Sequence, residues 1–189
     1  MNKTKRKIFE TSMSLFAKKG YDATSIEEIT SVVGVAKGTL YYHFSSKEEI
    51  FNFLVEEGMN LLKKSIKIKT SIENTSQGKL KAIILIQIKI IVKYEDFITI
   101  VLSQMLGKGS KSLTIQKYLF EYLKIVEDII QDGINNNEIS NNIVADVLAY
   151  SIFSFTCSSL LHKIKTNEPL DIYKLYDEYV NILTGNVFE

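Results

Sequence analysis

Apolar side chains recur every three or four residues along most of this chain, which is the period of an α-helix. In the segment 25–33, one helical face carries Ile26, Ile29, Val32 and Val33. Gly34 follows, and glycine tolerates the positive φ angles at which many helices end. Upstream, Thr24 and Glu27 have the spacing of a capping box, which satisfies free amides at a helix start. We therefore predict a short amphipathic helix that ends at Gly34.

The same spacing predicts helices over most of the remaining chain. The expected ranges are 3–19, 37–44, 79–94, 96–105, 112–135, 141–165 and 170–183, with a further helix from Ser45 or Ser46 to about residue 67. Residues 79–94 are rich in isoleucine and could form a strand. Three lysines fall on one side of a helical wheel, however, and the run is longer than a typical strand. Residues 69–78 are polar and are expected to link two domains. The predicted fold class is all-α, with about nine helices.

The segment 37–44 differs from the helix before it. It carries small, basic and aromatic side chains instead of a second broad apolar face. A short helix of this kind, following an amphipathic helix and a tight turn, suits the major groove of DNA. Leu40 and Phe44 are the positions that we expect to face the protein core. The pattern predicts a helix-turn-helix that reads DNA.

Residues 8–51 resemble the DNA-binding region of the TetR family of bacterial transcriptional regulators. The matching stretches are 8–9 (Ile-Phe), 15–21 (Leu-Phe-Ala-Lys-Lys-Gly-Tyr), 24–29 (Thr-Ser-Ile-Glu-Glu-Ile), 34–44 (Gly-Val-Ala-Lys-Gly-Thr-Leu-Tyr-Tyr-His-Phe) and 46–51 (Ser-Lys-Glu-Glu-Ile-Phe). Thr30 and Val33 stand where this family usually has alanine, and Ala36 stands where it usually has a capping serine or threonine. The first two alter helix packing, and the third removes an N-cap worth about 1 kcal/mol. None of them removes a group that would face DNA.

The resemblance implies two domains and a set of DNA contacts. We expect a helix-turn-helix domain over residues 1–47 and a helical ligand-binding and dimerisation domain over residues 48–189. The DNA contacts are expected from Lys37, Gly38, Thr39, Tyr41, Tyr42 and His43, with Lys47 gripping phosphate. Only Lys37 and the tyrosines can read base edges directly. Tight binding to an operator in double-stranded DNA should therefore require two linked half-sites.

The charge distribution agrees with DNA binding. The 189 residues carry a formal net charge of only +1, but the first 20 hold six lysine or arginine residues against one glutamate. A basic N-terminal arm attracts phosphate without sequence preference, although a terminal lysine run can also be a solvated tail. We see neither an uninterrupted apolar stretch of membrane-spanning length nor a signal peptide, so we expect a cytoplasmic protein that does not bind membranes.

The segment beyond residue 78 is rich in apolar and aromatic residues, which fits a pocket for a small apolar effector and fits a plain core about as well. The candidate pocket residues are Gln87, Phe120, Tyr150, Phe153 and Cys157. Cys157 can also be read as a buried apolar side chain or a redox-sensing thiol. In the family, the last two helices pair with a second copy. Here the small residues that would allow such close approach, or would simply pack within one subunit, are Ala145, Ala149, Ser151, Ser154, Ser158 and Ser159.

Enzymatic function is not expected. The chain has two histidines, and it lacks a zinc-protease motif, a nucleophile elbow and a phosphate-binding glycine loop. We predict no catalytic residues, no metal site and no cofactor. The predicted function is a homodimeric repressor that a small apolar ligand releases from an inverted-repeat operator. Two alternatives stay open: a regulator controlled by a protein partner or by nothing, and a helical interaction module that does not bind DNA.

Overall fold

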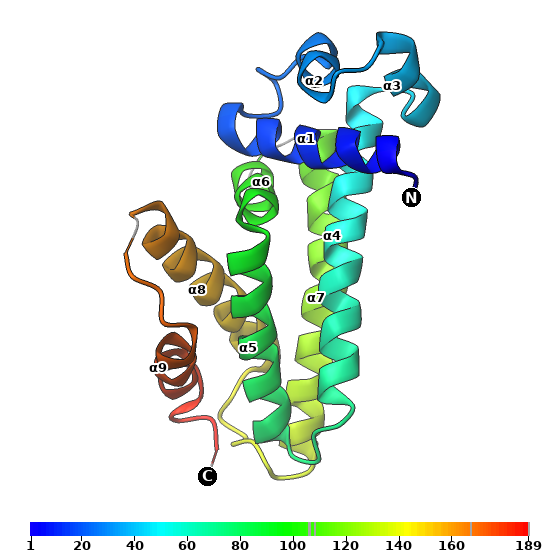
Figure 1. The fold of residues 1–189 in the computed structure, drawn as a ribbon. Coiled ribbons are helices and arrows are strands. Elements are labelled where there is room, and N and C mark those ends of the chain that lie inside the picture. Colours follow the sequence, from blue (N-terminus) through cyan, green and yellow to red (C-terminus); the bar gives the residue numbers. More distant parts are fainter. Residues whose placement is uncertain (106, 108, 167, 189) are drawn as a thin grey trace. The chain divides into compact units, whose positions relative to one another are not determined.

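The computed structural model describes residues 1–105, 107, 109–166 and 168–188. Within them the chain forms nine helices and no strand, which confirms the predicted all-α class (Figure 1). The helices are α1 (Lys3–Lys19), α2 (Ile26–Val33), α3 (Lys37–His43), α4 (Lys47–Thr70), α5 (Ser76–Lys93), α6 (Glu95–Met105), α7 (Ser110–Asn135), α8 (Ala145–Lys165) and α9 (Ile172–Thr184). The isoleucine-rich run is helical, as its lysine spacing indicated.

The chain divides into two compact units that interleave in sequence. Unit 1 comprises Met1–Gly58 and Asp96–Tyr118, and unit 2 comprises Met59–Glu95 and Leu119–Glu189. Helices α4 and α7 therefore each contribute residues to both units. The functional division into a DNA-binding domain over residues 1–47 and a ligand-binding and dimerisation domain over residues 48–189 stays a prediction.

Unit 1 is built around α1, α2, α3 and the first half of α4. Ile8, Ile29, Leu40 and Ile50, one from each of these helices, have no exposed surface. Phe51 lies near the rings of Phe16 and Tyr21, with centroid distances of 6.5 and 5.3 Å. A continuous apolar and aromatic core thus holds four short or amphipathic segments together, none of which would be stable alone.

The start of α2 differs from the predicted capping box. Ser25, not Thr24, is the N-cap, and its side chain accepts a hydrogen bond from the amide of Glu28 at 3.0 Å. Thr24 is buried, and its hydroxyl donates to the carbonyl of Gly20 at 2.9 Å. Both residues have a glutamate three positions downstream, so the sequence pattern alone could not separate them. The buried position of Thr24 decides the register.

The start of α4 has a cap of the expected kind. Ser46 Oγ accepts a hydrogen bond from the amide of Glu49 at 3.0 Å, and the Glu49 carboxylate accepts from the amide of Ser45 at 2.6 Å. The chain leaves α3 and re-enters a helix within three residues because these side chains satisfy the amides between the two helices.

A glycine in α4 allows close packing of α6 within unit 1. A Cβ atom added to Gly58 would overlap the ring of Phe97, so the aromatic ring rests directly on the α4 backbone. Phe97 is 4% exposed. Any larger residue at position 58 would force this ring to move.

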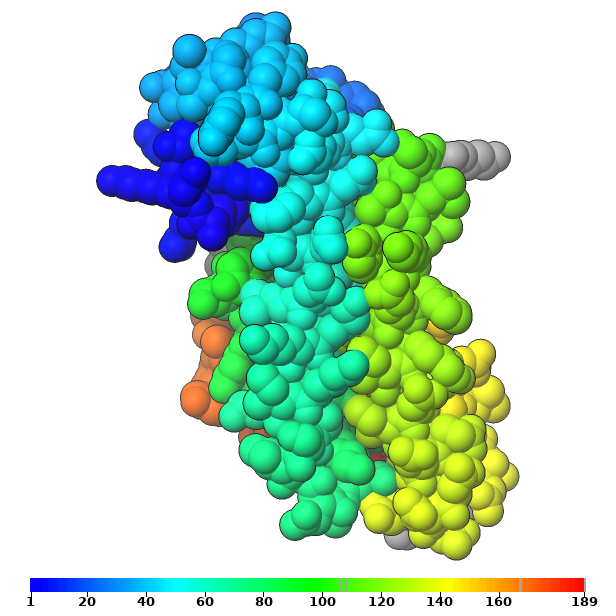
Figure 2. Space-filling view, turned by 90° about the vertical axis from the view of Figure 1, so that its right-hand side faces the viewer, coloured from blue at the N-terminus to red at the C-terminus, as the bar shows by residue number. Residues whose placement is uncertain are grey.

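In unit 2, α5 packs against both α8 and α9. Its side chains Ile83, Ile84 and Ile88 are fully buried. The second half of α4 and α7 lie side by side in Figures 1 and 2. An ion pair joins them, with Lys63 Nζ 2.6 Å from Glu121 Oε2. The predicted linker over residues 69–78 is wrong, because α4 continues to Thr70 and α5 begins at Ser76. Both ends of the short turn between them belong to unit 2.

Helix α8 is the most apolar of the long helices in the part of the chain that the structure describes. It has 21 residues, and an 18-residue window reaches a mean hydropathy of 1.2, so by length and composition it could cross a membrane. A single such helix is a weak indication, because core helices of globular proteins have the same properties. Here one face, including Ile152, Phe153 and Leu160, is buried in unit 2. The predicted start at residue 141 was too early, because Val144 is extended and precedes the first helical residue, Ala145.

Candidate nucleic-acid interface

The turn between α2 and α3 has the geometry that its glycine predicted. Gly34 adopts a left-handed conformation, with φ of 77° and ψ of 40°, and its amide and that of Val35 both donate to the carbonyl of Thr30. Ala36 precedes α3 without a side-chain hydrogen bond. The first turn of α3 therefore keeps amides that no side-chain cap satisfies.

Helix α3 has a buried side and an exposed side. Leu40 and Phe44 are 0% and 1% exposed, which confirms that they face the core. Tyr42 is 84% exposed and Tyr41 is 45% exposed. The other predicted contact residues on this helix are Lys37 and Gly38, which are exposed, and Thr39 and His43, which are half-buried. The helix thus presents two tyrosines and a lysine from one short, rigidly anchored turn and a half.

Two contacts organise the exposed side chains of α3. The Tyr42 and His43 rings meet edge to face, with centroids 5.0 Å apart. Lys37 Nζ lies 2.5 Å from Glu27 Oε1 of α2 and 5.9 Å from the centre of the Tyr41 ring. The hydrogen bond from the Lys37 ammonium lowers the pKa of the Glu27 carboxyl. Lys37 is therefore paired with a carboxylate in the free protein, and it must leave this partner to bind phosphate or a base.

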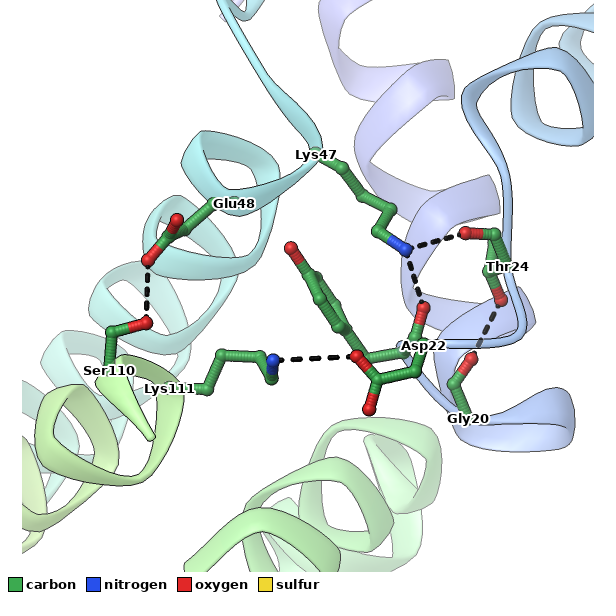
Figure 3. A network of polar contacts seen from close by, with 8 residues as sticks. Gly20, Asp22, Thr24, Lys47, Glu48, Ser110 and Lys111 are labelled. Carbon is green, nitrogen blue, oxygen red and sulfur yellow. Dashed lines mark hydrogen bonds and ion pairs between the residues drawn. The ribbon is translucent and has the colours of Figure 1, made fainter. Parts of the chain in front are cut away.

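Lys47 has a structural role that the sequence analysis did not anticipate. Its ammonium donates to the carbonyls of Tyr21 and Thr24, at 2.9 and 2.8 Å, and lies 4.3 Å from the centre of the Tyr21 ring (Figure 3). These contacts tie the first residue of α4 to the turn after α1. The role in phosphate binding predicted for Lys47 stays a prediction, and its ammonium already has three favourable contacts.

The first turn of α7 joins the same network, as Figure 3 shows. Ser110 Oγ donates to Glu48 Oε1 at 2.8 Å, and Lys111 Nζ lies 3.5 Å from Asp22 Oδ1. Lys111 also lies 4.3 Å from the centre of the Tyr21 ring, as Lys47 does. Sequence analysis missed Ser110 and Lys111, because 62 and 89 residues separate them from their partners. No local pattern reports contacts over such distances.

The basic N-terminus is largely helical, since α1 begins at Lys3. Lys5 lies 4.8 and 4.6 Å from the ring centres of Phe44 and Phe53, and Lys7 donates to the carbonyl of Val33 at 2.8 Å. These cations therefore stabilise unit 1 as well as contributing positive potential. Because Lys5 and Lys7 contact other parts of unit 1, this segment differs from the solvated tail considered above.

The five predicted pocket residues do not lie together. Gln87, Phe153 and Cys157 are buried, whereas Phe120 and Tyr150 are 64% and 51% exposed. Gln87 Nε2 donates to the hydroxyl of Tyr122, a residue that was not among the predicted five. The Tyr122 ring lies 5.7 Å from that of Phe153. Burial raises the pKa of the Cys157 thiol to about 12, which disfavours its reactive thiolate form.

Gln87, Tyr122, Phe153 and Cys157 form a buried cluster in unit 2, and some buried polar atoms of this unit are unsatisfied. Gln87 Oε1 and Thr156 Oγ1 lack hydrogen-bond partners among the described residues. If the Gln87 amide were turned over, its oxygen could accept from Tyr122, but its nitrogen would then lack the partner. Either orientation leaves one amide group available to another molecule. Among the described residues, no group of three or more His, Cys, Asp or Glu side chains could hold a metal ion.

Comparison with known proteins agrees with this geometry. The family model for bacterial regulatory proteins of the tetR family matches residues 8–54. A solved structure from Clostridium perfringens, assigned as a regulator of fatty acid metabolism, is similar over its whole length. It has 32% sequence identity and a TM-score of 0.88, and the match covers 97% of this chain and 100% of that one.

The chain belongs to the TetR family. Its N-terminal helix-turn-helix lies within the residues that the family model matches, and its C-terminal region is helical.

Two curated relatives match this TetR-family chain over shorter regions. The uncharacterized helix-turn-helix transcriptional regulator YerO of Bacillus subtilis is 38% identical over 113 residues, which are 55% of this chain and 37% of that protein. IcaR of Staphylococcus epidermidis, a negative regulator of the icaADBC biofilm operon, is 43% identical over 56 residues, 30% of each chain. The chain thus aligns with about a third of the length of these two relatives.

Proposed function

We propose that this TetR-family protein is a repressor that binds an inverted-repeat operator as a homodimer in the cytoplasm and is released by a small apolar effector. The observation that carries the proposal is the two-sided character of α3. Its Leu40 and Phe44 are buried anchors, and Tyr42 is 84% exposed beside Lys37 and Gly38. A large exposed aromatic side chain beside a lysine and a glycine can contact base edges in the groove of a DNA duplex.

The side chains of α3 have different proposed roles. Tyr42 and Tyr41 contact thymine methyl groups and base edges, and Lys37 reads a guanine or binds phosphate after leaving Glu27. Gly38 lets the phosphate backbone approach closely, and Thr39 and His43 donate hydrogen bonds to it. Because few groups reach base edges, one half-site should bind modestly. A two-fold dimer would place two such helices about 34 to 36 Å apart, one turn of DNA.

The proposed dimer uses the outer faces of α8 and α9. On α8, Val147 and Tyr150 are 59% and 51% exposed, and on α9 Ile182 is 65% exposed. Ser151, Ser154 and Ser158 are exposed between these apolar residues and are small enough for close helix approach. By contrast, Ala145 and Ala149 are buried within the subunit and would not take part.

The proposed effector site is the buried cluster of unit 2 that contains Gln87, Tyr122, Phe153 and Cys157. An effector there would gain free energy from apolar contact and could bond the unsatisfied amide group of Gln87. The assignment of the Clostridium perfringens protein to fatty acid metabolism supports an acyl compound as the chemical class. Phe120 and Tyr150 would lie outside this site.

We call residues 8–54, which the family model matches, the DNA-binding head. Release of DNA is proposed to proceed through α4, which starts within this head and continues into unit 2. A ligand can shift the equilibrium only through a difference in affinity for the two conformations. Moving it from 1:99 to 99:1 requires about 5.5 kcal/mol. The contacts of Ser110 and Lys111 to the head provide a second connection, because α7 also continues into unit 2.

The proposal is tested on the promoter region of the gene itself. Footprinting with the purified protein should protect an inverted repeat with two-fold symmetry, and addition of an acyl compound should abolish the protection. Protection of one asymmetric half-site by a monomer would refute the dimeric arrangement. Protection that no apolar compound removes would favour control by a protein partner, and absence of any DNA binding would favour an interaction module.

A further inference from the structure

A cleft lies on unit 2, on the face of α5 opposite to the buried cluster. Its volume is about 390 Å³, within the range of small-molecule sites. The lining residues come from the end of α4 and the following turn, from α5, and from Tyr176 on α9. All of them belong to unit 2. Gln87 and Ile83 point to the core on the other side of the same helix, so the cleft is distinct from the proposed effector site.

The cleft has an apolar floor between basic groups. Ile72, Leu85 and Ile86 provide the apolar surface, and Tyr176 adds an aromatic ring. Lys69, Lys81 and Lys89 also line it. Lys81, Leu85 and Lys89 follow one another at spacings of four residues, which places them in one row along α5. At 1.5 Å per residue, the two lysines of this row are about 12 Å apart along the helix axis.

The three lysines are available for a ligand. In the part of the chain that the structure describes, none of their ammonium groups has an ion pair or a hydrogen bond. Lys69 precedes the α4–α5 turn and Lys81 follows it, so these two cations lie toward one end of the cleft. Glu73 is the single acidic residue in the lining. A Cβ atom added to Gly78 would lie 2.6 Å from Glu73 Oε2, so this carboxylate lies against the first turn of α5, where the three lysines of the lining outnumber it.

We infer that this cleft binds an anionic amphiphile, a molecule with a carboxylate or phosphate head on an apolar chain. The head would bind Lys69 and Lys81 through charge-assisted hydrogen bonds, which are stronger than neutral ones. The chain would lie on Leu85 and Ile86, beside the methylene stem of Lys89. A simple anion would leave the apolar floor exposed, and a neutral lipid would leave the lysines unpaired. The inference does not depend on operator binding or on the proposed effector site.

The experiment measures the acetylation rate of individual lysines in the full-length protein by mass spectrometry. The probes are dodecanoate below its critical micelle concentration, dodecanol and inorganic phosphate. Dodecanoate should slow acetylation of Lys69 and Lys81 by about tenfold, the effect of one charge-assisted interaction. Dodecanol and phosphate should leave both rates nearly unchanged. Lys67, an exposed lysine of α4 outside the cleft, is the internal control.

Variants locate the binding. Lys81→Gln should lower the affinity for dodecanoate at the cleft by about tenfold, whereas the matched variant Lys67→Gln should have no effect. Lengthening the chain from octanoate to decanoate should raise the affinity by up to about tenfold, which is the limit for two fully buried methylenes. Neither variant should change operator release by an apolar effector, so this test is independent of the proposed function.

Several results would overturn the inference. Unchanged acetylation with dodecanoate would show that the cleft does not bind it. Equal protection by inorganic phosphate would reduce the cleft to a simple anion site. Protection by phosphatidylglycerol vesicles without protection by dodecanoate would identify a membrane-binding surface instead. An affinity independent of chain length would show that the apolar floor is not used.

Discussion

Helix α3 and the buried cluster of unit 2 differ in how well the sequence predicted which side chains are buried. In α3, Leu40 and Phe44 face the core and Tyr42 faces solvent, as the local pattern predicted. In unit 2, Phe120 and Tyr150 were predicted in a pocket and are exposed, whereas Tyr122 was not predicted there and is fully buried. A short helix with one strongly apolar side has a single way to pack. A long helix between several neighbours has more than one apolar face, and its surroundings decide which face is buried.

Removing the anchor of α3 should lower the stability of unit 1 more than any other change considered below. Phe44→Ala should destabilise unit 1 by about 3 to 5 kcal/mol, the usual cost of truncating a buried aromatic side chain. Tyr42→Ala should change stability by less than about 0.5 kcal/mol, because the ring is mostly exposed. Chemical denaturation of both variants measures this. Similar losses in both would mean that α3 is not two-sided as described.

The contacts of Lys47 predict a smaller loss of stability. Lys47→Met keeps the apolar stem but removes two hydrogen bonds from the ammonium to carbonyls. We expect a loss of about 1.5 to 3 kcal/mol, typical of hydrogen bonds to a charged group. Denaturation provides the measurement, with Lys67→Met as the matched control. If stability were unchanged and only DNA affinity fell, phosphate binding would be the main role of Lys47.

The buried pair in unit 2 is tested by a double-mutant cycle. Gln87→Leu alone should cost about 1 to 3 kcal/mol, because it leaves the Tyr122 hydroxyl without its partner in the core. The double variant Gln87→Leu with Tyr122→Phe should recover most of that loss, since it removes both polar groups. Purely additive effects would contradict a direct contact. If Gln87 also binds the effector, the double variant should fold but no longer release DNA.

The role of Tyr42 in reading bases is measured by comparing operators. Tyr42→Ala should reduce discrimination against a substituted base pair in the half-site by about 1 to 3 kcal/mol. Binding to unrelated DNA should change little. Thr39→Ala, which removes a proposed phosphate contact, serves as the comparison and should weaken binding to all sequences alike. A uniform loss from Tyr42→Ala would assign that ring to the backbone.

Removing the partner of Lys37 should change DNA affinity only slightly. Glu27→Gln removes the carboxylate that holds the Lys37 ammonium at 2.5 Å. Binding to any DNA should become tighter, and the salt dependence of binding should rise by up to about one phosphate contact. Stability should hardly change, because exposed ion pairs contribute little. Titrations at several salt concentrations test this, and weaker binding would show that Glu27 positions Lys37 for DNA instead.

Local sequence was sufficient to predict α2, the turn at Gly34 and α3. The pattern comprises the helical spacing in α2, Gly34 at the turn, and Leu40 and Phe44 facing the core. All of these residues lie within 20 positions of one another, so a single stretch of chain contains the whole pattern. The helical state of the isoleucine-rich α5 was also predictable, because the run is longer than a typical strand and three of its lysines fall on one side of a helical wheel. The choice between Thr24 and Ser25 as the cap of α2 was not, since both have a suitable glutamate.

Contacts between distant segments depend on how the helices pack in the folded protein. The sequence does not reveal that Ser110 and Lys111 join the DNA-binding head, that Tyr122 meets Gln87, or that Lys69 and Lys81 line one cleft. Helical periodicity specifies which residues share a face, but not which neighbour covers that face. That choice depends on the summed packing of several helices at once, and so these sites exist only when the chain is folded.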